Sequence, residues 1–182
     1  MTQTRAAYLL ESEILMHISG TPGSGKTTLL NKLADDHPEF AYRDLDSFLR
    51  WNEKGNRLIK RSQRIQKWVD SQKRPIIIGG NHVNDDGSPM YYLPLSIQRK
   101  YYLSTPPLKS ALRANMRRRR WNKMDKVKPV SLLRQSKWIH QEWKQGKHDV
   151  KYFQKQGYVP KSYDQIRHEV AQLAQHHKVQ DK

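Results

Sequence analysis

The sequence predicts an α/β fold in which helices flank a mainly parallel β-sheet. Short apolar segments rich in β-branched residues alternate along the chain with segments of helical periodicity, and this alternation is typical of strand–helix–strand units. The segment 75–78 is apolar throughout, as expected for a central parallel strand covered on both faces. With 182 residues, the chain is expected to form one domain over residues 1–182.

A phosphate-binding motif follows the first predicted strand, Ile14–Ser19. Residues 20–27 match the P-loop pattern G-x-x-x-x-G-K-[ST], and a helix is expected from Lys26 to before Pro38. In such a loop backbone N–H groups surround a β-phosphate, the lysine reaches the β- and γ-phosphates, and the hydroxyl of Thr27 binds Mg²⁺. We therefore expect ATP and Mg²⁺ as cofactors, with Lys26 catalytic; the alternative is a glycine-rich turn with a chance lysine. The predicted nucleotide-binding residues here are Gly20, Pro22, Gly23, Ser24, Gly25, Lys26, Thr27 and Thr28.

Two aspartates follow the second predicted strand, residues 40–43. Asp44 and Asp46 form a D-x-D at its carboxyl end, the edge where open α/β sheets bind ligands. A carboxylate there can accept the proton of an acceptor hydroxyl or support Mg²⁺. Both are predicted catalytic residues, Asp44 also as a metal ligand and Asp46 also as a substrate-binding residue. The alternative is a helix cap or turn.

The third predicted strand, residues 75–78, follows a helix over 58–72 and ends at the same edge of the sheet. Glycines at that point let a ligand approach the backbone closely, and polar side chains beside them can hydrogen-bond an acceptor. The predicted substrate-binding residues are Gly79, Gly80, Asn81 and His82. A tight turn with polar filler is the alternative. Because glycine stands where such strands often carry an acid, metal support is assigned to the D-x-D.

A helix with an arginine-rich face is expected after the fourth predicted strand, residues 100–103. Its buried stripe is predicted to be Leu108, Leu112 and Met116, while Arg113 and Arg117 share another face with Arg120. Arginine matches phosphate oxygens, so Arg113 is a predicted nucleotide-binding residue and Arg117 a predicted catalytic one. A solvated helix surface is the alternative.

The rest of the chain predicts three helical segments and one short strand. A helix over 131–145 is expected to end at Gly146, and a second piece over 149–156 at Gly157. A short strand follows at 158–159. A capping box of Ser162 and Gln165 then opens the last helix, whose predicted buried stripe is Ile166, Val170 and Leu173.

The positive charge is concentrated in the second half of the chain. Residues 91–182 hold 21 lysines and arginines against 6 acids, whereas residues 1–90 hold 13 against 11. Either an anionic partner, phosphates or nucleic acid, is expected, or the charge forms a solubilising surface. Three tryptophans in this half can stack on bases, although core positions are the more usual role; they are Trp121, Trp138 and Trp143.

Composition excludes several classes of protein. The absence of cysteine excludes disulfides and thiolate metal sites. No apolar run approaches the roughly 20 residues of a membrane span, and the first residues lack the pattern of a signal peptide. We expect a soluble cytoplasmic protein with no membrane partner.

The order of these features resembles the P-loop small-molecule kinases, a group that includes adenylate kinase, other nucleoside and nucleotide kinases, and shikimate kinase. The motif, the D-x-D, the glycine pair and the arginine-rich segment span roughly residues 14–175. The resemblance implies a three-layer sandwich around a five-stranded parallel sheet of order 2-3-1-4-5. It also implies a mobile, arginine-rich lid over 117–130, acceptor and metal contacts from the D-x-D and glycine pair, and adenine flanked by residues 158–161.

Three functions follow as hypotheses. The first is a kinase that transfers the γ-phosphoryl group of ATP to a small acceptor, a nucleoside or nucleotide. The second is a polynucleotide 5′-hydroxyl kinase, or a similar nucleic-acid enzyme, whose basic half binds the strand. The third is a non-catalytic ATP-binding module.

Overall fold

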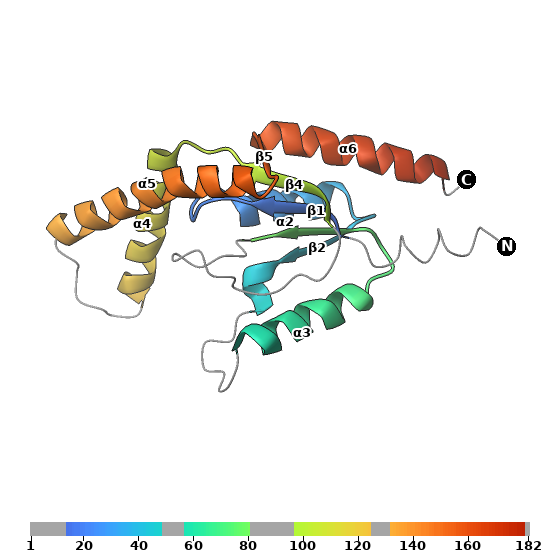
Figure 1. Ribbon diagram of the computed structural model, residues 1–182, viewed down its shortest axis with the longest axis horizontal. Coiled ribbons are helices and arrows are strands. Elements are labelled where there is room, and N and C mark those ends of the chain that lie inside the picture. Colours follow the sequence, from blue (N-terminus) through green and yellow to red (C-terminus); the bar gives the residue numbers. More distant parts are fainter. Residues whose placement is uncertain (1–13, 49–56, 81–96, 125–131, 181–182) are drawn as a thin grey trace.

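The computed structural model describes residues 14–48, 57–80, 97–124 and 132–180. Five strands form one all-parallel sheet in the order β2-β3-β1-β4-β5, so the α/β class and the strand order predicted above are confirmed (Figure 1). The strands are β1 (Ile14–Ser19), β2 (Ala41–Asp44), β3 (Ile76–Gly79), β4 (Ile97–Leu103) and β5 (Val159–Lys161).

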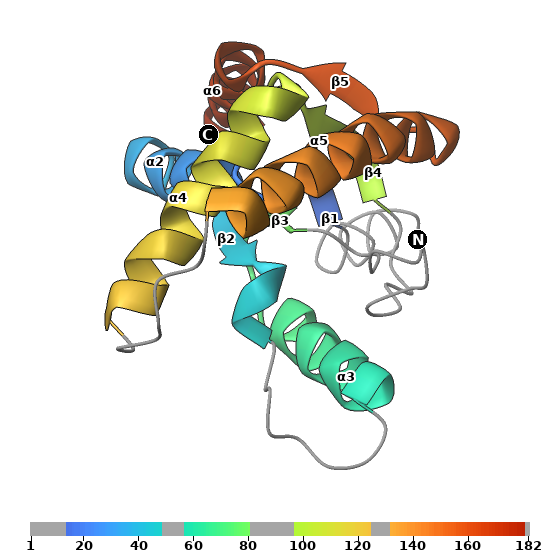
Figure 2. The same ribbon diagram turned by 90° about the vertical axis from the view of Figure 1, so that its left-hand side faces the viewer.

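Helices cover both faces of the sheet. They are α2 (Lys26–Asp36), α3 (Arg57–Asp70), α4 (Pro107–Met124), α5 (Leu132–Lys155) and α6 (Tyr163–Gln180), with a 3-10 turn, η1 (Leu45–Phe48), directly after β2. Leucines of α2 and apolar residues of α6 pack in one cluster with β1 and β4. On the opposite face α3 packs against β1 and β3, and α5 packs against β4 and the approach to β5. The central sheet is thus enclosed in a three-layer arrangement (Figures 1 and 2).

The alternation of side chains along each strand explains the two core layers. In β3, Ile77 joins the cluster under α2 and α6, while Ile76 and Ile78 join the cluster under α3. All six residues of β1 are buried, because β1 lies between β3 and β4. The sequence of a central parallel strand must therefore be apolar on both faces, as its pattern indicated.

The predicted buried stripe of α4 is wrong. Leu108, Leu112 and Met116 are 53%, 44% and 57% exposed. The buried positions of this helix carry small or polar side chains instead: Ser110, Ala111, Ala114 and Asn115. The physical reason is close backbone approach. A Cβ atom at Gly23 would lie 2.4 Å from the carbonyl oxygen of Ser110, so large side chains do not fit where α4 crosses the loop after β1.

The predicted end of a helix at Gly146 is also wrong. The segments 131–145 and 149–156 form one continuous helix, α5, which runs to Lys155. Gly146 is buried within it, and a single glycine costs a helix interior only about 1 kcal/mol, less than the packing of α5 on the sheet and on α4 supplies. The turn at Gly157 is confirmed, since this residue has φ +81° after the helix ends.

The last helix agrees with its predicted pattern. The N–H of Gln165 donates to Oγ of Ser162 at 3.2 Å and the N–H of Ser162 donates to Oε1 of Gln165 at 2.8 Å, so the capping box is confirmed. Of the predicted stripe, Ile166 and Val170 are fully buried, and Leu173 is partly buried against the same cluster. Among the helices in the described part of the chain, none has the length and apolar character needed to cross a membrane.

Candidate active site

The P-loop motif forms a tight turn between β1 and α2. Gly23 and Gly25 have φ values of +79° and +100°, a backbone conformation that only glycine adopts readily. The N–H of Ser24 donates to the carbonyl oxygen of Thr21 at 3.1 Å, and Oγ1 of Thr105 donates to the carbonyl oxygen of Ser24 at 3.0 Å. The loop is therefore anchored both to itself and to the segment before α4.

Lys26 lies folded over this loop. Its Nζ donates to the carbonyl oxygens of Gly20 and, at 3.0 Å, of Thr21. These carbonyl contacts keep the ammonium group at the mouth of the loop. Such a cation can exchange carbonyl oxygens for phosphate oxygens, because both are acceptors and phosphate carries the greater negative charge.

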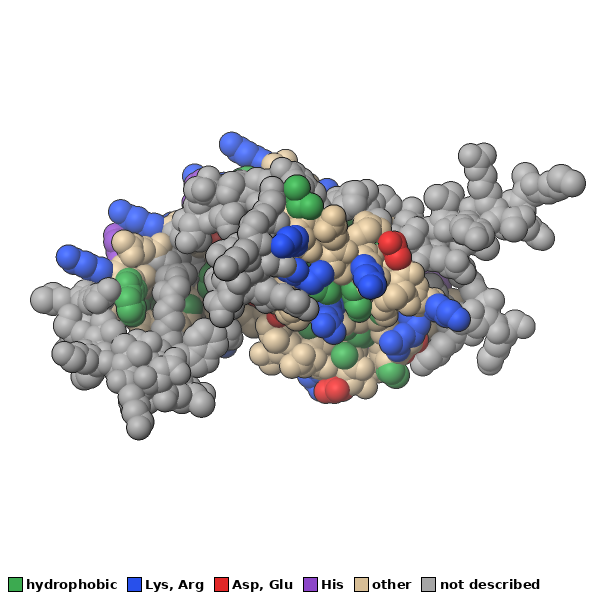
Figure 3. All heavy atoms as spheres, turned by 90° about the horizontal axis from the view of Figure 1, so that it is seen from below, with side chains coloured by type: hydrophobic (Ala, Val, Ile, Leu, Met, Phe, Trp, Pro, Cys, Tyr) green, Lys and Arg blue, Asp and Glu red, His purple; other side chains and the backbone are tan. Residues whose placement is uncertain are grey.

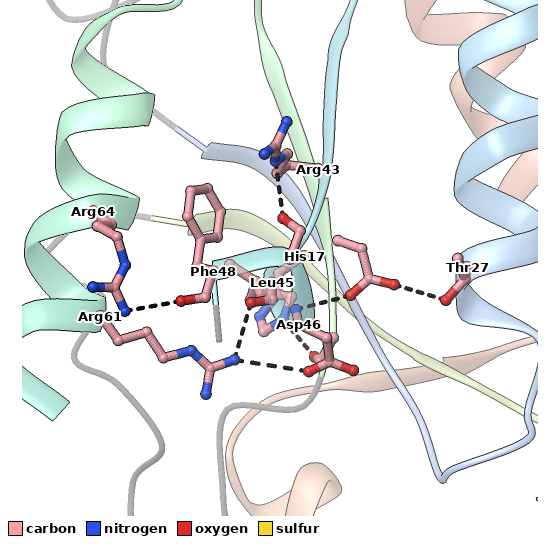
Figure 4. A network of polar contacts seen from close by, with 11 residues as sticks. His17, Thr27, Arg43, Leu45, Asp46, Phe48, Arg61 and Arg64 are labelled. Carbon is pink, nitrogen blue, oxygen red and sulfur yellow. Dashed lines mark hydrogen bonds and ion pairs between the residues drawn. The ribbon is translucent and has the colours of Figure 1, made fainter. Parts of the chain in front are cut away.

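The end of β2 reaches the start of α2 through one carboxylate. Oγ1 of Thr27 donates to Oδ2 of Asp44 at 2.7 Å, and the other oxygen, Oδ1, accepts the backbone N–H of Asp46 at 3.0 Å (Figure 4). This second bond is an Asx turn, which begins η1 and fixes the direction of the chain after β2. The alternative role predicted for the D-x-D, a turn, is thus confirmed for Asp44. In the same turn, Oδ2 of Asp44 accepts the hydrogen bond from Thr27 of the P-loop.

A buried arginine supports the second aspartate. Arg61 of α3 is 3% exposed; its NH2 donates to the carbonyl oxygen of Leu45 at 3.0 Å and lies 3.7 Å from Oδ1 of Asp46. Arg64, one turn further along α3, donates to the carbonyl oxygen of Phe48 at 2.9 Å. The two arginines hold η1, and Asp46 with it, at the edge of the sheet (Figure 4).

The carboxyl group of Asp46 has a raised pKa. Partial desolvation by the surrounding chain is the main cause and the charge of Asp44 adds to it, while Lys26 and Arg61 act in the opposite direction. The side chain of Asp46 nonetheless keeps 62% of its surface exposed. A carboxylate that is open to solvent and holds its proton more tightly than usual is suited to general base chemistry.

The glycine pair after β3 lies next to these aspartates. A Cβ atom at Gly80 would be 2.9 Å from Cβ of Leu45 and 3.6 Å from Oδ1 of Asp44, and one at Gly79 would be 2.4 Å from Cδ1 of Leu30. No side chain fits at either position without movement of its neighbours. Glycine at these positions allows the end of β3 to pack closely against Leu30 of α2 and Leu45 of η1.

Two of the predicted substrate-binding residues lie outside the described residues: Asn81 and His82.

The predicted phosphate-binding arginines belong to α4. Arg113 is exposed, and its Cβ would lie 3.3 Å from a Cβ atom at Gly23, so α4 places it beside the P-loop. Arg117 belongs to α4. Of the predicted lid, residues 117–124 continue α4 and residues 125–130 lie outside the described part. Thr28 and Pro22 are exposed on the motif.

A buried series of hydrogen bonds reaches Gly80, and the sequence did not predict it. His17 of β1 is fully buried; its Nε2 donates to the carbonyl oxygen of Gly80 at 3.0 Å, and its Nδ1 accepts the hydroxyl of Tyr158 at 2.6 Å. The carbonyl oxygen can only accept, which fixes the neutral tautomer with the proton on Nε2. Burial raises the pKa of Tyr158, so its hydroxyl stays a donor. These two hydrogen bonds link Tyr158, which precedes β5, to Gly80, which follows β3.

Sequence reasoning also missed Arg61. A signal was present, because Arg61 stands four residues before Ile65 and eight before Val69, both fully buried stripe residues of α3. A charged residue in the register of a buried stripe indicates a paired, structural cation. The contacts of His17 had no such signal, since they join residues 63 and 141 positions apart.

A separate groove lies where α6 meets β4 and β5. It is lined by residues of β4, β5 and α6: Arg99, Lys161, Asp164, Gln165, His168, Glu169, Gln172, Leu173 and His176. Glu169 accepts hydrogen bonds from Tyr101 and Lys161 and lies 3.3 Å from Nε of Arg99. None of these residues belongs to the P-loop or to the D-x-D, so the groove is distinct from the candidate active site.

Comparison with known proteins found no protein-family model that matches this chain and no significant match among curated proteins. The geometry of the site therefore carries the functional argument.

Proposed function

We propose that this protein is a phosphotransferase of the P-loop kinase type, which transfers the γ-phosphoryl group of ATP to a nucleoside or nucleotide. One observation carries the proposal: Thr27 of the P-loop helix is hydrogen-bonded at 2.7 Å to Asp44 at the end of the neighbouring strand, and Asp46 follows two residues later. A phosphate-binding loop, an oxygen donor pair and a second carboxylate thus meet at the carboxyl edge of a parallel sheet, where such folds bind ligands.

The oxygen donors fit Mg²⁺. The ion binds one or two carboxylates together with hydroxyl, water and phosphate oxygens, and the Thr27 hydroxyl and Asp44 carboxylate supply this kind of set. Thr27 would coordinate the ion and Asp44 would support it. When bound, Mg²⁺ neutralises charge on the phosphates during transfer. Among the described residues, no cluster of three or more histidine, cysteine or acidic side chains offers a second metal site.

Each catalytic residue has a defined role in the proposed reaction. Lys26 holds the β- and γ-phosphates as the bond between the γ-phosphorus and the bridging oxygen breaks. The acceptor oxygen forms a new bond to that phosphorus, ADP leaves, and where the acceptor is a hydroxyl Asp46 takes its proton. Arg113 of α4 contacts phosphate oxygens in the proposed reaction, since its guanidinium group matches their geometry.

The acceptor has a second candidate, the 5′-hydroxyl of a polynucleotide. The same donor site would serve, and the excess of 21 basic over 6 acidic residues in the second half of the chain favours a polyanionic partner. A non-catalytic role as an ATP-binding module remains the alternative if no acceptor is phosphorylated.

A labelled phosphate transfer screen tests the proposal. The wild type would be incubated with γ-labelled ATP and Mg²⁺ against nucleosides, nucleotides, sugars and 5′-hydroxyl oligonucleotides. We expect transfer to one acceptor class and a loss of roughly 100-fold or more in Lys26→Ala, because charge stabilisation at the transferring group is removed. The exposed lysine variant Lys67→Ala is the matched control and should retain the wild-type rate. Full transfer by Lys26→Ala would contradict the proposal.

A further inference from the structure

Helix α5 carries a continuous row of exposed basic side chains. They are Lys137, His140, Lys144, Lys147, His148, Lys151 and Lys155, and each is exposed. Successive members are three or four positions apart, apart from the adjacent pair Lys147 and His148, so the row lies on one side of the helix. From Lys137 to Lys155 the row is about 27 Å long at 1.5 Å per residue. We call it the α5 basic row.

Basic side chains are visible at the corresponding part of the surface. In Figure 3, Lys or Arg (blue) and His (purple) side chains follow one another along the left end of the molecule, the end that holds α5 in Figure 1.

Within the described residues, acidic side chains do not neutralise the row. The sequence of α5 contains two acids, Glu142 and Asp149, and neither stands three, four or seven residues from any member of the row. Asp149 is buried, with 7% exposure. No ion pair joins the row to an acid within the described ranges. Like charges one turn apart destabilise a helix by about 0.2–0.5 kcal/mol per pair, so the row carries a cost that an anionic partner would remove.

The opposite side of α5 is already occupied. Phe153 is fully buried against Tyr102 and Tyr158, and α5 also packs on α4, where Nδ2 of Asn115 donates to the carbonyl oxygen of Gln135 at 3.3 Å. A helix that binds in the membrane interface needs a free apolar face to insert. The buried apolar face of α5 does not serve that purpose, so a linear polyanion is the better match than a lipid surface.

An aromatic ring borders the row. Nζ of Lys147 lies 3.8 Å from the ring centroid of Trp143, and the ring of His140 lies 5.6 Å from it. Trp143 is half-buried. Cations interleaved with aromatic rings are typical of surfaces that track a nucleic-acid backbone and offer stacking positions to its bases.

We infer that the α5 basic row binds a nucleic-acid strand through its phosphates. One turn of helix advances 5.4 Å, so the lysines present a cation to the strand at nearly every turn. Lysine acts as a point charge toward phosphate, and the expected binding is independent of base sequence. The inference rests on the row alone and does not require phosphotransfer at the P-loop.

Salt-dependent binding to an oligonucleotide tests the inference. The probe is a fluorescein-labelled oligothymidylate of about 20 nucleotides, longer than typical single-strand binding sites, and anisotropy is measured from about 50 to about 200 mM salt. With four or five lysines in contact, the slope of log K against log salt should be about −3. The triple variant Lys137→Gln, Lys144→Gln, Lys151→Gln should reduce the slope by about 2 and weaken binding roughly tenfold or more.

A matched variant separates the row from net charge. Replacing the exposed lysines Lys60, Lys67 and Lys73 by glutamine removes the same charge from α3 and the turn after it, and should change binding little. Lys26→Ala should bind the oligonucleotide like the wild type, whatever its phosphotransfer activity. Equal losses in both triple variants would overturn the inference. So would failure of the wild type to bind, or binding to vesicles of phosphatidylcholine and phosphatidylserine in place of the oligonucleotide.

Discussion

Gly79→Ala tests how closely the P-loop helix is packed against the end of β3. A methyl group at this position would lie 2.4 Å from Cδ1 and 3.1 Å from Cγ of Leu30, whereas carbon atoms in contact are about 3.5–4.0 Å apart. The conflict of roughly 1 Å falls on a side chain that is only 3% exposed. Gly79 is not among the glycines with positive φ, so the cost is steric.

The expected cost is about 1–3 kcal/mol, the range for overpacking a well-packed core. For a chain of this size that is a drop of about 2–12 °C in Tm. Urea unfolding, followed by tryptophan fluorescence, would measure the free energy of unfolding. Leu30→Ala alone should cost about 2–5 kcal/mol because it leaves a cavity.

A double-mutant cycle identifies the contact responsible. In the Leu30→Ala background the added methyl enters vacated space, so Gly79→Ala should cost almost nothing there, and the two changes should couple by about 1–3 kcal/mol. The same destabilisation in both backgrounds would refute the reasoning, because the clash with Leu30 would then not be its source.

Two further predictions concern carboxyl groups. Because the pKa of Asp46 is raised above the ordinary 3.8, the acid limb of the kcat/KM profile should lie above that value, and Asp46→Asn should remove most activity. Asp46→Asn should also raise Tm at neutral pH, because ionising a group whose pKa is raised in the folded protein costs stability above that pKa. Phosphate transfer by Asp46→Asn at the wild-type rate would contradict a catalytic role for Asp46. For Glu169, burial would raise the pKa, but hydrogen bonds from Lys161 and Tyr101 and the charges of Lys161 and Arg99 lower it below 4.5. Glu169→Gln should therefore lower the free energy of unfolding by about 1–3 kcal/mol at neutral pH. This loss should shrink as the pH falls through the pKa of Glu169 in the folded protein. Urea unfolding at several pH values measures it, and a loss that does not vary with pH would argue against the prediction.

Local patterns were sufficient for much of the fold. The strand–loop–helix around Lys26 and the capping box at Ser162 depend on residues close in sequence, and both are present. The strand order came from resemblance to a known group of proteins, and it too is confirmed.

Close packing between distant segments was beyond the sequence. Hydrophobicity selected Leu108, Leu112 and Met116 as the buried stripe of α4, yet small residues are buried there because the helix backbone lies against Gly23. Gly146 was predicted to end a helix by local propensity, which tertiary packing overrode. Both errors have the same origin, since periodicity reports which residues are apolar and not how near two backbones come.

Part of the candidate site could be predicted and part could not. The motif and the position of the D-x-D after a strand indicated that Thr27, Asp44 and Asp46 would meet. The different contacts of the two aspartates required the structure, because Oδ2 of Asp44 bonds Thr27 while the buried Arg61 lies beside Asp46. The link from Tyr158 through His17 depends on contacts between strands far apart in the chain.

The central claim is that residues 20–27 bind ATP together with Mg²⁺ beside Asp44. The most direct test is calorimetric titration of a non-hydrolysable ATP analogue into the wild type, Lys26→Ala and Asp44→Asn, with and without Mg²⁺. We predict that the wild type binds the analogue more tightly with Mg²⁺, that Asp44→Asn loses this gain, and that Lys26→Ala binds at least tenfold more weakly, a difference of about 1.4 kcal/mol. Absence of binding to the wild type, or the same affinity in all three proteins, would contradict the claim.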